Sequence, residues 1–170
     1  MLTVEQILPA VEERLVTVKA DALLIDAAKL LNGPRQNLVV VCDDRGKMTG
    51  VITKTDVVSR ISQCTGCSCM MAASHVMTRE VTFCRPSDRL HDVWSMVKQR
   101  GLKNIPIVDR DTVPLGVLNA RDMVRVLLED TEHEESLLRD YVIGIGYRYV
   151  VQEWTSDQKR SPAMAGSNVL

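Results

Sequence analysis

Two aspartates close near-identical heptapeptides and are the residues best placed to do chemistry. "GVITKTD" occupies residues 50–56 and "GVLNARD" occupies residues 116–122, so Asp56 and Asp122 lie 66 positions apart. Thr53 and Asn119 each follow an apolar stretch and precede a segment whose apolar residues recur at helical spacing. Each is therefore suited to be a helix N-cap. The aspartate falls at the third helical position. This predicts a capping box, in which the cap side chain accepts from a helix N–H and the acid reaches back.

The same geometry can bind a sugar phosphate. Free N–H groups and the positive end of a helix dipole attract phosphate, and a carboxylate there can accept from both hydroxyls of a ribose. Capping and binding use the same atoms, so the residues alone leave both interpretations open. The second copy adds Arg121 within its heptapeptide and Lys103 in "GLKNIPIVD". Each can give a phosphate a charge-assisted contact, with an ordinary solvated surface role as the alternative.

The heptapeptides belong to a longer internal repeat, which must position them. Residues 16–61 align with residues 82–127, and each copy is predicted to form a strand, a helix, a hairpin of two strands and a second helix. Short helical turns at 4–8 and 73–77 precede the copies. The predicted fold is α/β (α+β), with two similar half-domains packed face to face. The predicted segments are a first repeat with its lead-in (1–62), a linker (63–73), a second repeat (74–130), a helical extension (131–155) and a polar tail (156–170).

Composition excludes several classes of protein. The 170 residues are 45% hydrophobic, which is enough for a sizeable core, and 21 Lys and Arg nearly balance 22 Asp and Glu. Such a balance gives no global field to attract nucleic acid or an anionic membrane. No apolar run approaches the ~20 residues of a membrane span, and the N-terminus carries acids where a signal peptide would be basic. We therefore expect a cytoplasmic protein with no nucleic-acid or membrane partner.

The predicted linker contains "CTGCSC", and its cysteines offer a second kind of chemistry. Cys64, Cys67 and Cys69, with His75 six residues further on, could complete a tetrahedral zinc site or act as a redox switch. A second paired-cysteine knuckle is missing, so a flexible linker with reduced thiols is the alternative. No nucleophile and base pair or phosphate-binding P-loop is visible, and we expect no enzymatic activity.

The doubled heptapeptide, preceded by "NIPIVD" and flanked by matching elements, resembles the CBS domain. The chain is similar to a tandem CBS pair, or Bateman module, over residues 1 to about 130. The resemblance implies a three-stranded sheet and two helices per repeat, a pseudo-two-fold pair, and frequent homodimers. It also implies adenine nucleotides in the clefts between repeats. "DYVIGIGYR" at 140–148 resembles a C-terminal signature of small stand-alone bacterial CBS proteins.

The resemblance also implies which residues hold a nucleotide. The adenine would contact backbone and aliphatic edges, Thr17 and Val39 in the first cleft and Thr82, Ile105 and Pro106 in the second. Val39 stands where the family has a proline, so the second cleft, with Asn119, Arg121 and Asp122, is favoured over the first.

The function that follows is a regulatory module, with no required cofactor, that senses AMP, ADP, ATP or NAD(H) and signals to a partner protein. A metal- or thiol-based redox switch in the linker is the alternative. A structural dimer with empty clefts is a third possibility.

Overall fold

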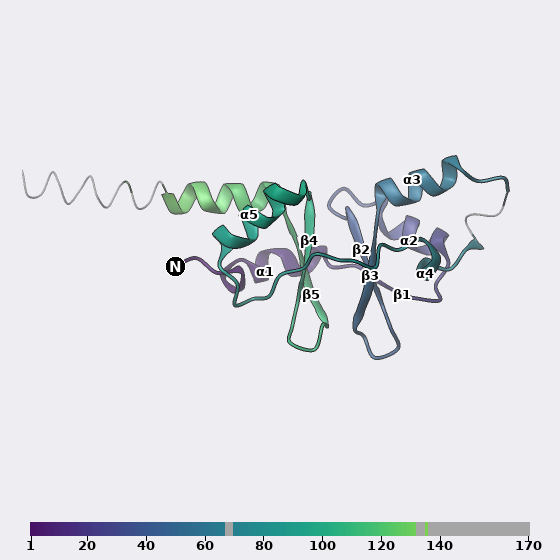
Figure 1. Cartoon of the computed structure of the whole chain (residues 1–170), viewed down its shortest axis with the longest axis horizontal. Helices are drawn as coiled ribbons and strands as arrows, with labels where there is room; N and C mark the ends of the chain where they lie inside the picture. Colours follow the sequence, from purple (N-terminus) through teal and green to yellow (C-terminus); the bar gives the residue numbers. More distant parts are fainter. Residues whose placement is uncertain (67–69, 132–134, 136–170) are drawn as a thin grey trace, which may run out of the picture. The chain divides into compact units, whose positions relative to one another are not determined.

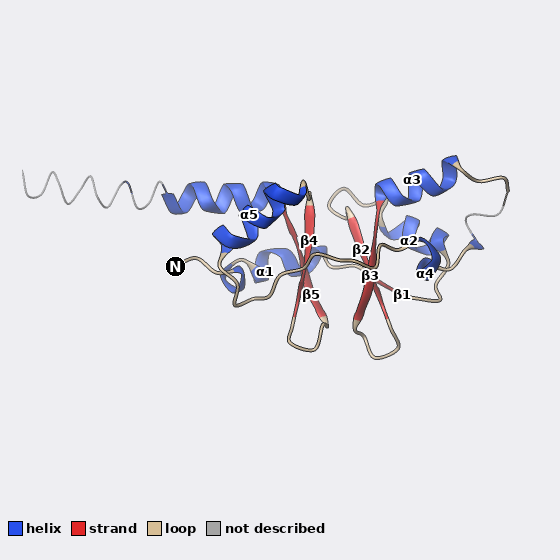
Figure 2. Ribbon diagram, viewed as in Figure 1, coloured by secondary structure: helices blue, strands red, loops and turns tan. Residues whose placement is uncertain are grey.

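Most elements of the chain occur twice in the same order (Figure 1, Figure 2). The computed structural model describes residues 1–66, 70–131 and 135. The first repeat contains β1 (Thr17–Lys19), α2 (Leu24–Leu30), β2 (Leu38–Cys42), β3 (Met48–Thr53) and α3 (Lys54–Ser62). The second contains α5 (Leu90–Arg100), β4 (Asn104–Val108), β5 (Pro114–Asn119) and a helix over residues 120–131. The lead-ins are η1 (Val4–Gln6), α1 (Leu8–Val11) and η2 (Glu12–Arg14) before the first repeat and α4 (Ala73–Val76) before the second.

Both predicted hairpins are confirmed, and an aspartate organises each turn. Strands β2 and β3 pair antiparallel, as do β4 and β5. In the first turn, Asp43 Oδ1 accepts from two backbone N–H groups, each at 2.9 Å. Asp109 Oδ1 does the same in the second turn, at 2.8 Å. These side-chain bonds replace strand pairing where the backbone reverses.

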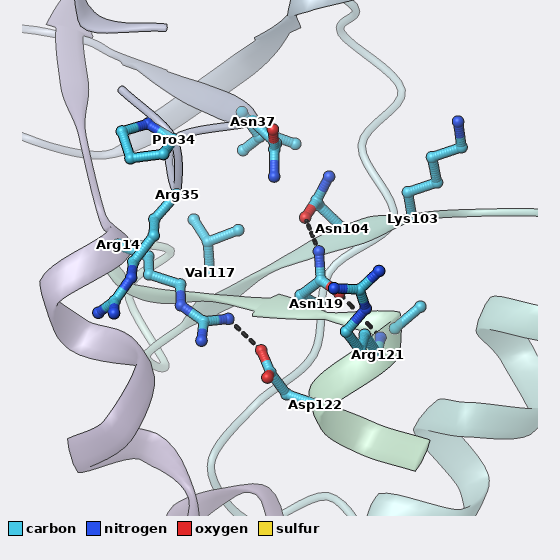
Figure 3. Close-up of a pocket in the computed structure, with 12 residues that line it drawn as sticks. Arg14, Pro34, Arg35, Asn37, Lys103, Asn104, Val117, Asn119, Arg121 and Asp122 are labelled. Carbon is cyan, nitrogen blue, oxygen red and sulfur yellow. Dashed lines mark hydrogen bonds and ion pairs between the residues drawn. The ribbon is translucent and has the colours of Figure 1, made fainter. Parts of the chain in front are cut away.

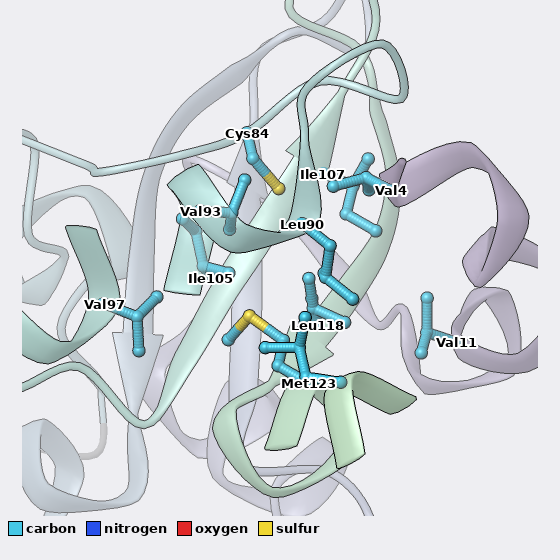
Figure 4. Packing of buried hydrophobic residues seen from close by; sticks show 11 residues of the cluster. Val4, Val11, Cys84, Leu90, Val93, Val97, Ile105, Ile107, Leu118 and Met123 are labelled. Atoms are coloured by element: carbon cyan, nitrogen blue, oxygen red, sulfur yellow. The ribbon is translucent and has the colours of Figure 1, made fainter. Parts of the chain in front are cut away.

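The first helix of each repeat is held by the same apolar positions. Leu24 and Ala27 of α2 are buried, and their counterparts 66 residues later, Leu90 and Val93, are buried on α5. The spacing of three residues keeps each pair on one helical face. Figure 4 shows Leu90 and Val93 packed with Ile105 and Leu118 of the β4–β5 hairpin.

The first strand of the second repeat departs from the prediction. β1 pairs in parallel with β2, and further bonds run from Val40 N to the Val16 carbonyl (3.0 Å) and from Ala20 N to the Cys42 carbonyl (3.1 Å). In the second repeat the pairing shrinks to one bridge, between Cys84 and Ile107. The cause is covalent, because the counterparts of both N–H donors, 66 residues later, are prolines.

Each lead-in packs on the other repeat. Val4 N donates to the Asp88 carbonyl at 3.0 Å and Glu5 N to the Pro86 carbonyl at 2.9 Å, which ties the N-terminal segment to the second repeat. Figure 1 shows α1 beside β5 accordingly. Conversely, Ala73 N at the start of α4 donates to the Ala22 carbonyl of the first repeat at 2.7 Å. The chain therefore crosses between repeats at residues 12–16 and again at 78–82.

The glycine of each heptapeptide admits the crossing chain. A Cβ on Gly50 would lie 2.6 Å from Met77 Sδ and 2.8 Å from the Thr78 carbonyl oxygen. A Cβ on Gly116 would lie 3.3 Å from Leu8 Cδ1 and 3.4 Å from the Val11 carbonyl oxygen. Both approaches are closer than ordinary packing, and the first is much the closer. The repeated glycine thus has a packing role that is independent of any ligand.

Equivalent residues also pack the two repeats against one another. A buried cluster joins Val51 of β3 to its counterpart Val117 of β5, with Leu15 and Val81 of the two crossings packed against it. This matches the expected pseudo-two-fold pair. Within residues 1–66, 70–131 and 135, no helix combines the length and apolar character that a bilayer crossing needs. The predicted tail at 156–170 and most of the extension at 131–155, including "DYVIGIGYR", lie outside the described residues.

Candidate ligand pockets between the repeats

Asp56 forms the predicted capping box. Thr53 N donates to Asp56 Oδ2 at 2.7 Å, and Asp56 N donates to Thr53 Oγ1 at 3.3 Å. The Thr53 hydroxyl also donates to Asp56 Oδ2 at 2.7 Å. One carboxylate oxygen thus closes the start of α3.

Asp122, its counterpart, has different partners. Its carboxylate pairs with the guanidinium of Arg14, from η2 at the first crossing (Figure 3). Arg125 Nη2 lies 3.9 Å from the other oxygen. The side chains of Arg14 and Asp122 are 24% and 16% exposed, so the ion pair is partly shielded from water. The cap is made by Asn119 Oδ1, which accepts from Arg121 N at 2.8 Å. The predicted capping box is therefore found in the first copy and replaced by an ion pair in the second.

A pocket of about 500 Å³ lies beside Asp122, and we call it the Asp122 pocket. The described residues that line it include four basic side chains and one acidic side chain. The lining residues are Arg14, Pro34, Arg35, Asn37, Leu38, Lys103, Asn104, Val117, Asn119, Ala120, Arg121 and Asp122. Both repeats contribute to it, and the basic groups make it a concentrated positive site in a chain with a net charge of −1. Such a site favours an anionic ligand.

A second pocket, of about 580 Å³, lies beside Asp56, and we call it the Asp56 pocket. Its described lining has two basic and two acidic side chains, so its charges balance. The lining residues are Asn37, Leu38, Val51, Thr53, Lys54, Thr55, Asp56, Thr78, Glu80, Val81, Thr82, Gly101, Leu102, Lys103, Asn104, Pro106 and Asn119. Five of these also line the Asp122 pocket, which makes the pockets neighbours. Both volumes are within the range of small-molecule sites.

The predicted site residues divide between the pockets in an unexpected way. Thr53, Asp56, Thr82 and Pro106 line the Asp56 pocket, Arg121 and Asp122 line the Asp122 pocket, and Lys103 and Asn119 line both. The prediction grouped Thr82 and Pro106 with Asp122. The structure places them opposite Asp56 instead, because the crossing chain brings residues 78–82 to the start of α3.

Three predicted residues, Thr17, Val39 and Ile105, do not line either of these two pockets. Val39 and Ile105 are fully buried inside their own repeats. For Val39 the strand registers give the reason, since Val40 lies opposite Val51 as Pro106 lies opposite Val117. The counterpart of the proline is thus Val40, and a one-residue shift turns a strand side chain to the other face. Thr17 is exposed in β1.

Pro106 changes what the Asp56 pocket offers to a ligand. In the first repeat, Val40 N donates a hydrogen bond of 3.0 Å to the Val16 carbonyl. At the counterpart position Pro106 has no N–H to give, so the Thr82 carbonyl lacks this donor. The Thr82 hydroxyl, by contrast, accepts from Arg100 Nη1 at 2.7 Å. A backbone carbonyl beside the apolar face of a proline can accept a hydrogen bond from the amino group of a planar base.

Sequence reasoning missed several pocket residues, namely Arg14, Arg35, Glu80, Asn37 and Asn104. Arg14 and Glu80 are themselves 66 positions apart, so extending the repeat alignment two residues towards the N-terminus would have paired them. Asn104 is held in the wall, where its Oδ1 accepts from Asn119 Nδ2 at 2.9 Å (Figure 3).

Two of the four predicted metal ligands, Cys64 and His75, lie among the residues that the structure describes. Among the described residues, no group of three or more His, Cys, Asp or Glu side chains could hold a metal ion. Cys64 is half-buried and His75 is exposed, while Cys67 and Cys69 lie outside the described residues. The linker switch stays a prediction.

Comparison with known proteins shows which curated sequences this chain resembles. It is 24% identical over 145 residues to the uncharacterized protein MJ0188 of Methanocaldococcus jannaschii, covering 83% of this chain and 51% of that protein. It is 23% identical over 113 residues to an L-aspartate semialdehyde sulfurtransferase of Methanosarcina acetivorans, covering 66% of this chain and 22% of the relative. The chain thus spans about half of the length of the first relative and less than a quarter of the second.

Solved structures share the fold at low sequence identity. The CBS domain pair of protein MJ0100, solved with 5′-methylthioadenosine and S-adenosyl-L-methionine, has a TM-score of 0.65 and 21% identity, covering 76% of this chain and 98% of that one. CBSX2, solved with AMP, also has a TM-score of 0.65, with 24% identity, covering 77% of this chain and 99% of that one.

The family itself is shown by direct sequence matching. The CBS domain family matches residues 4–63 and again residues 73–129, which together make up more than half of the chain. The two matched segments coincide with the two structural repeats and their lead-ins. The chain belongs to the CBS-domain family, as a tandem CBS pair.

Proposed function

We propose that this chain is a regulatory module that binds an adenine nucleotide between its CBS repeats and passes the occupancy of the pocket to a partner protein. The ligand is AMP, ADP, ATP or NAD(H). The chain itself catalyses no reaction, acts as a homodimer in the cytoplasm and needs no cofactor. CBS-pair proteins are generally regulatory rather than catalytic, and two of the similar pairs were solved with adenosine ligands.

The Asp56 pocket carries this proposal, because three parts of a nucleoside site meet there. Pro106 and the Thr82 carbonyl offer an apolar face and an acceptor for the base. Asp56 keeps one carboxylate oxygen, Oδ1, outside the three bonds of the capping box, and that oxygen can accept from a ribose hydroxyl. The start of α3 adds backbone donors with the positive end of its dipole.

The position of the pockets supports a regulatory role. Each is lined by residues from both repeats, so a bound ligand contacts two half-domains at once. A ligand shifts an equilibrium only through unequal affinity for two arrangements, and a site between repeats is where such a difference arises. The enzymatic activity of the sulfurtransferase relative belongs to a protein of which this chain matches 22%.

Calorimetric titration with AMP, ATP and adenosine tests the proposal. We expect at least one of them to bind the wild-type chain, and Asp56→Asn to weaken adenosine by about tenfold, since it loses a charged acceptor worth ~1.5 kcal/mol. Asp44→Asn is the matched control, because Asp44 is 95% exposed and lines neither pocket. Absence of binding by these three ligands, and by ADP and NAD(H) titrated in the same way, would refute the proposed function.

A further inference from the structure

The two crossings carry opposite charges at one equivalent position. Arg14 immediately precedes Leu15, and Glu80 immediately precedes Val81, while Leu15 and Val81 pack in the same buried cluster between the repeats. The structure therefore supports the equivalence that the 66-residue period gives. Arg14 lines the Asp122 pocket and Glu80 lines the Asp56 pocket. The same backbone position thus faces each pocket with a different sign of charge.

At two further pairs of counterparts, the residue that lines the Asp122 pocket is again the more positive one. Arg35 lines the Asp122 pocket, whereas its counterpart in the Asp56 pocket is Gly101. Arg121 corresponds to Thr55 in the same way. Lys54 is the one opposing change among the described lining residues, as its counterpart is Ala120. Lys103 lines both pockets, so it favours neither.

We propose that the pair Arg14 and Glu80 sorts ligands by charge, so that the Asp122 pocket takes phosphate groups and the Asp56 pocket takes an adenosine group that is uncharged or cationic. The inference rests on the proposed function and assigns a ligand class to each pocket. Arg14 and Glu80 are specificity-determining residues in this scheme.

The physical basis is the charge that a phosphate meets on entry. In the Asp56 pocket two carboxylates, Asp56 and Glu80, offset the two basic side chains, so a phosphate gains no net attraction there. In the Asp122 pocket it approaches several guanidinium groups, which bind phosphate oxygens in a bidentate fork. Arg14 is already held over this pocket by Asp122, so it is positioned before the ligand arrives. An adenosine without phosphate does not need that attraction and keeps the proposed base contacts of Pro106 and Thr82 in the Asp56 pocket.

Nuclear magnetic resonance titration can follow each pocket separately, with the backbone amide signals of Asp56 and Asp122 as reporters. The probes are adenosine and AMP, at fixed ionic strength because salt screens these charges. In the wild-type chain we expect AMP to saturate the Asp122 signal at a concentration about tenfold lower than the Asp56 signal, and adenosine to show the opposite order. A tenfold difference corresponds to one charge-assisted contact of ~1.4 kcal/mol.

Charge reversal then tests the two residues directly. Glu80→Arg is expected to strengthen AMP binding about tenfold, as reported by the Asp56 signal, and Glu80→Gln to give an intermediate gain. Arg14→Gln is expected to weaken AMP binding by a similar factor, as reported by the Asp122 signal. Glu13→Arg is the matched control, because it makes the same charge change next to Arg14 but lines neither pocket. It should change the AMP concentration that saturates either signal by less than about twofold.

The possible failures are distinguishable. If neither probe shifts either signal in any variant, the proposed function fails and this inference fails with it. If both probes bind but AMP saturates the two signals at equal concentration, or Glu80→Arg changes AMP no more than Glu13→Arg does, the charge-sorting scheme is overturned while nucleotide binding stands.

Discussion

The Asp56 pocket and the Asp122 pocket are built on equivalent backbone, yet they present different chemistry. The pairs that pack are alike, such as Leu24 with Leu90 and Val51 with Val117. Several of the pairs that face the pockets differ in polarity or sign, as Arg14 and Glu80 do, although Asp56 and Asp122 are identical. Packing restricts a buried position to apolar residues of similar size, whereas a pocket wall tolerates any residue that water can reach. The duplicated scaffold has thus kept its core and diversified its sites.

Alanine substitution of the two heptapeptide glycines gives the largest expected difference, in the free energy of unfolding. Gly50→Ala places a methyl group 2.8 Å from the Thr78 carbonyl oxygen, and that backbone is pinned by bonds of 3.0 and 2.9 Å to Val51. Gly116→Ala meets its nearest atom at 3.3 Å, on the flexible side chain of Leu8. We expect Gly50→Ala to lower the free energy of unfolding by about 3 kcal/mol and Gly116→Ala by about 1 kcal/mol. Urea denaturation of both variants measures this, and equal losses would contradict the difference in approach.

The next effect concerns the proposed base-binding edge of the Asp56 pocket, where Pro106 gives the Thr82 carbonyl no N–H donor. Pro106→Val restores an N–H opposite the Thr82 carbonyl, as Val40 provides in the first repeat. The acceptor is then occupied, and we expect adenosine to bind about tenfold more weakly, for the loss of one hydrogen bond. Calorimetric titration measures the change.

Pro86→Ala is the matched control for this substitution. It restores the other missing donor of the strand, the counterpart of Ala20, but Pro86 lines neither pocket. Its adenosine affinity should stay within about twofold of the wild type. An equal loss in both variants would mean that the strand pairing, and not the free carbonyl, governs binding.

The two motif aspartates should differ in how salt affects their contribution to stability. Asp56→Ala removes the capping box of α3 and should cost about 1 kcal/mol with little salt dependence. Asp122→Ala removes a partly exposed ion pair with Arg14, which we expect to be worth about 0.5 kcal/mol in dilute buffer and less at 1 M salt. Thermal unfolding at two salt concentrations checks both. A salt-sensitive loss at Asp56 and an insensitive one at Asp122 would reverse the assignment.

Much of the fold could be predicted from the repeat alone. The hairpins, the helix starts at Thr53 and Asn119 and the short lead-in helices all follow from local patterns of apolar and turn residues. The shortened strand at Cys84 also had a local signal, since Pro86 and Pro106 each lack a donor. What no local pattern could give was the exchange of lead-ins between repeats, because it depends on contacts between residues far apart in sequence.

The composition of the pockets was harder to predict for the same reason. Thr53, Asp56 and Asp122 were found because the heptapeptide repeats. Thr82 was grouped with Asp122 but lines the Asp56 pocket, because the chain crossing that brings residues 78–82 to the start of α3 has no local signal in the sequence. Val39 was chosen through a one-residue misalignment of a uniformly apolar strand, where "LVVVC" offers no alternation to fix the face.

The last comparison sets a buried thiol against its counterpart in the first repeat. Burial, and secondarily Asp88, raises the pKa of Cys84 to about 12 from an ordinary value of 9.0. A pKa that is higher in the folded state gives a contribution that is complete below pH 9 and is lost as pH rises towards 12, because the unfolded thiol ionises first. Valine occupies the counterpart position, residue 18, so Cys84→Val is a substitution that the scaffold already contains. Between pH 8 and pH 9.5 we expect the wild-type chain to lose more stability than Cys84→Val in urea denaturation, by roughly 1 kcal/mol. Parallel pH profiles for the two proteins would show that the thiol does not carry this loss, and would leave Cys84 as a simple apolar filler of the bridge.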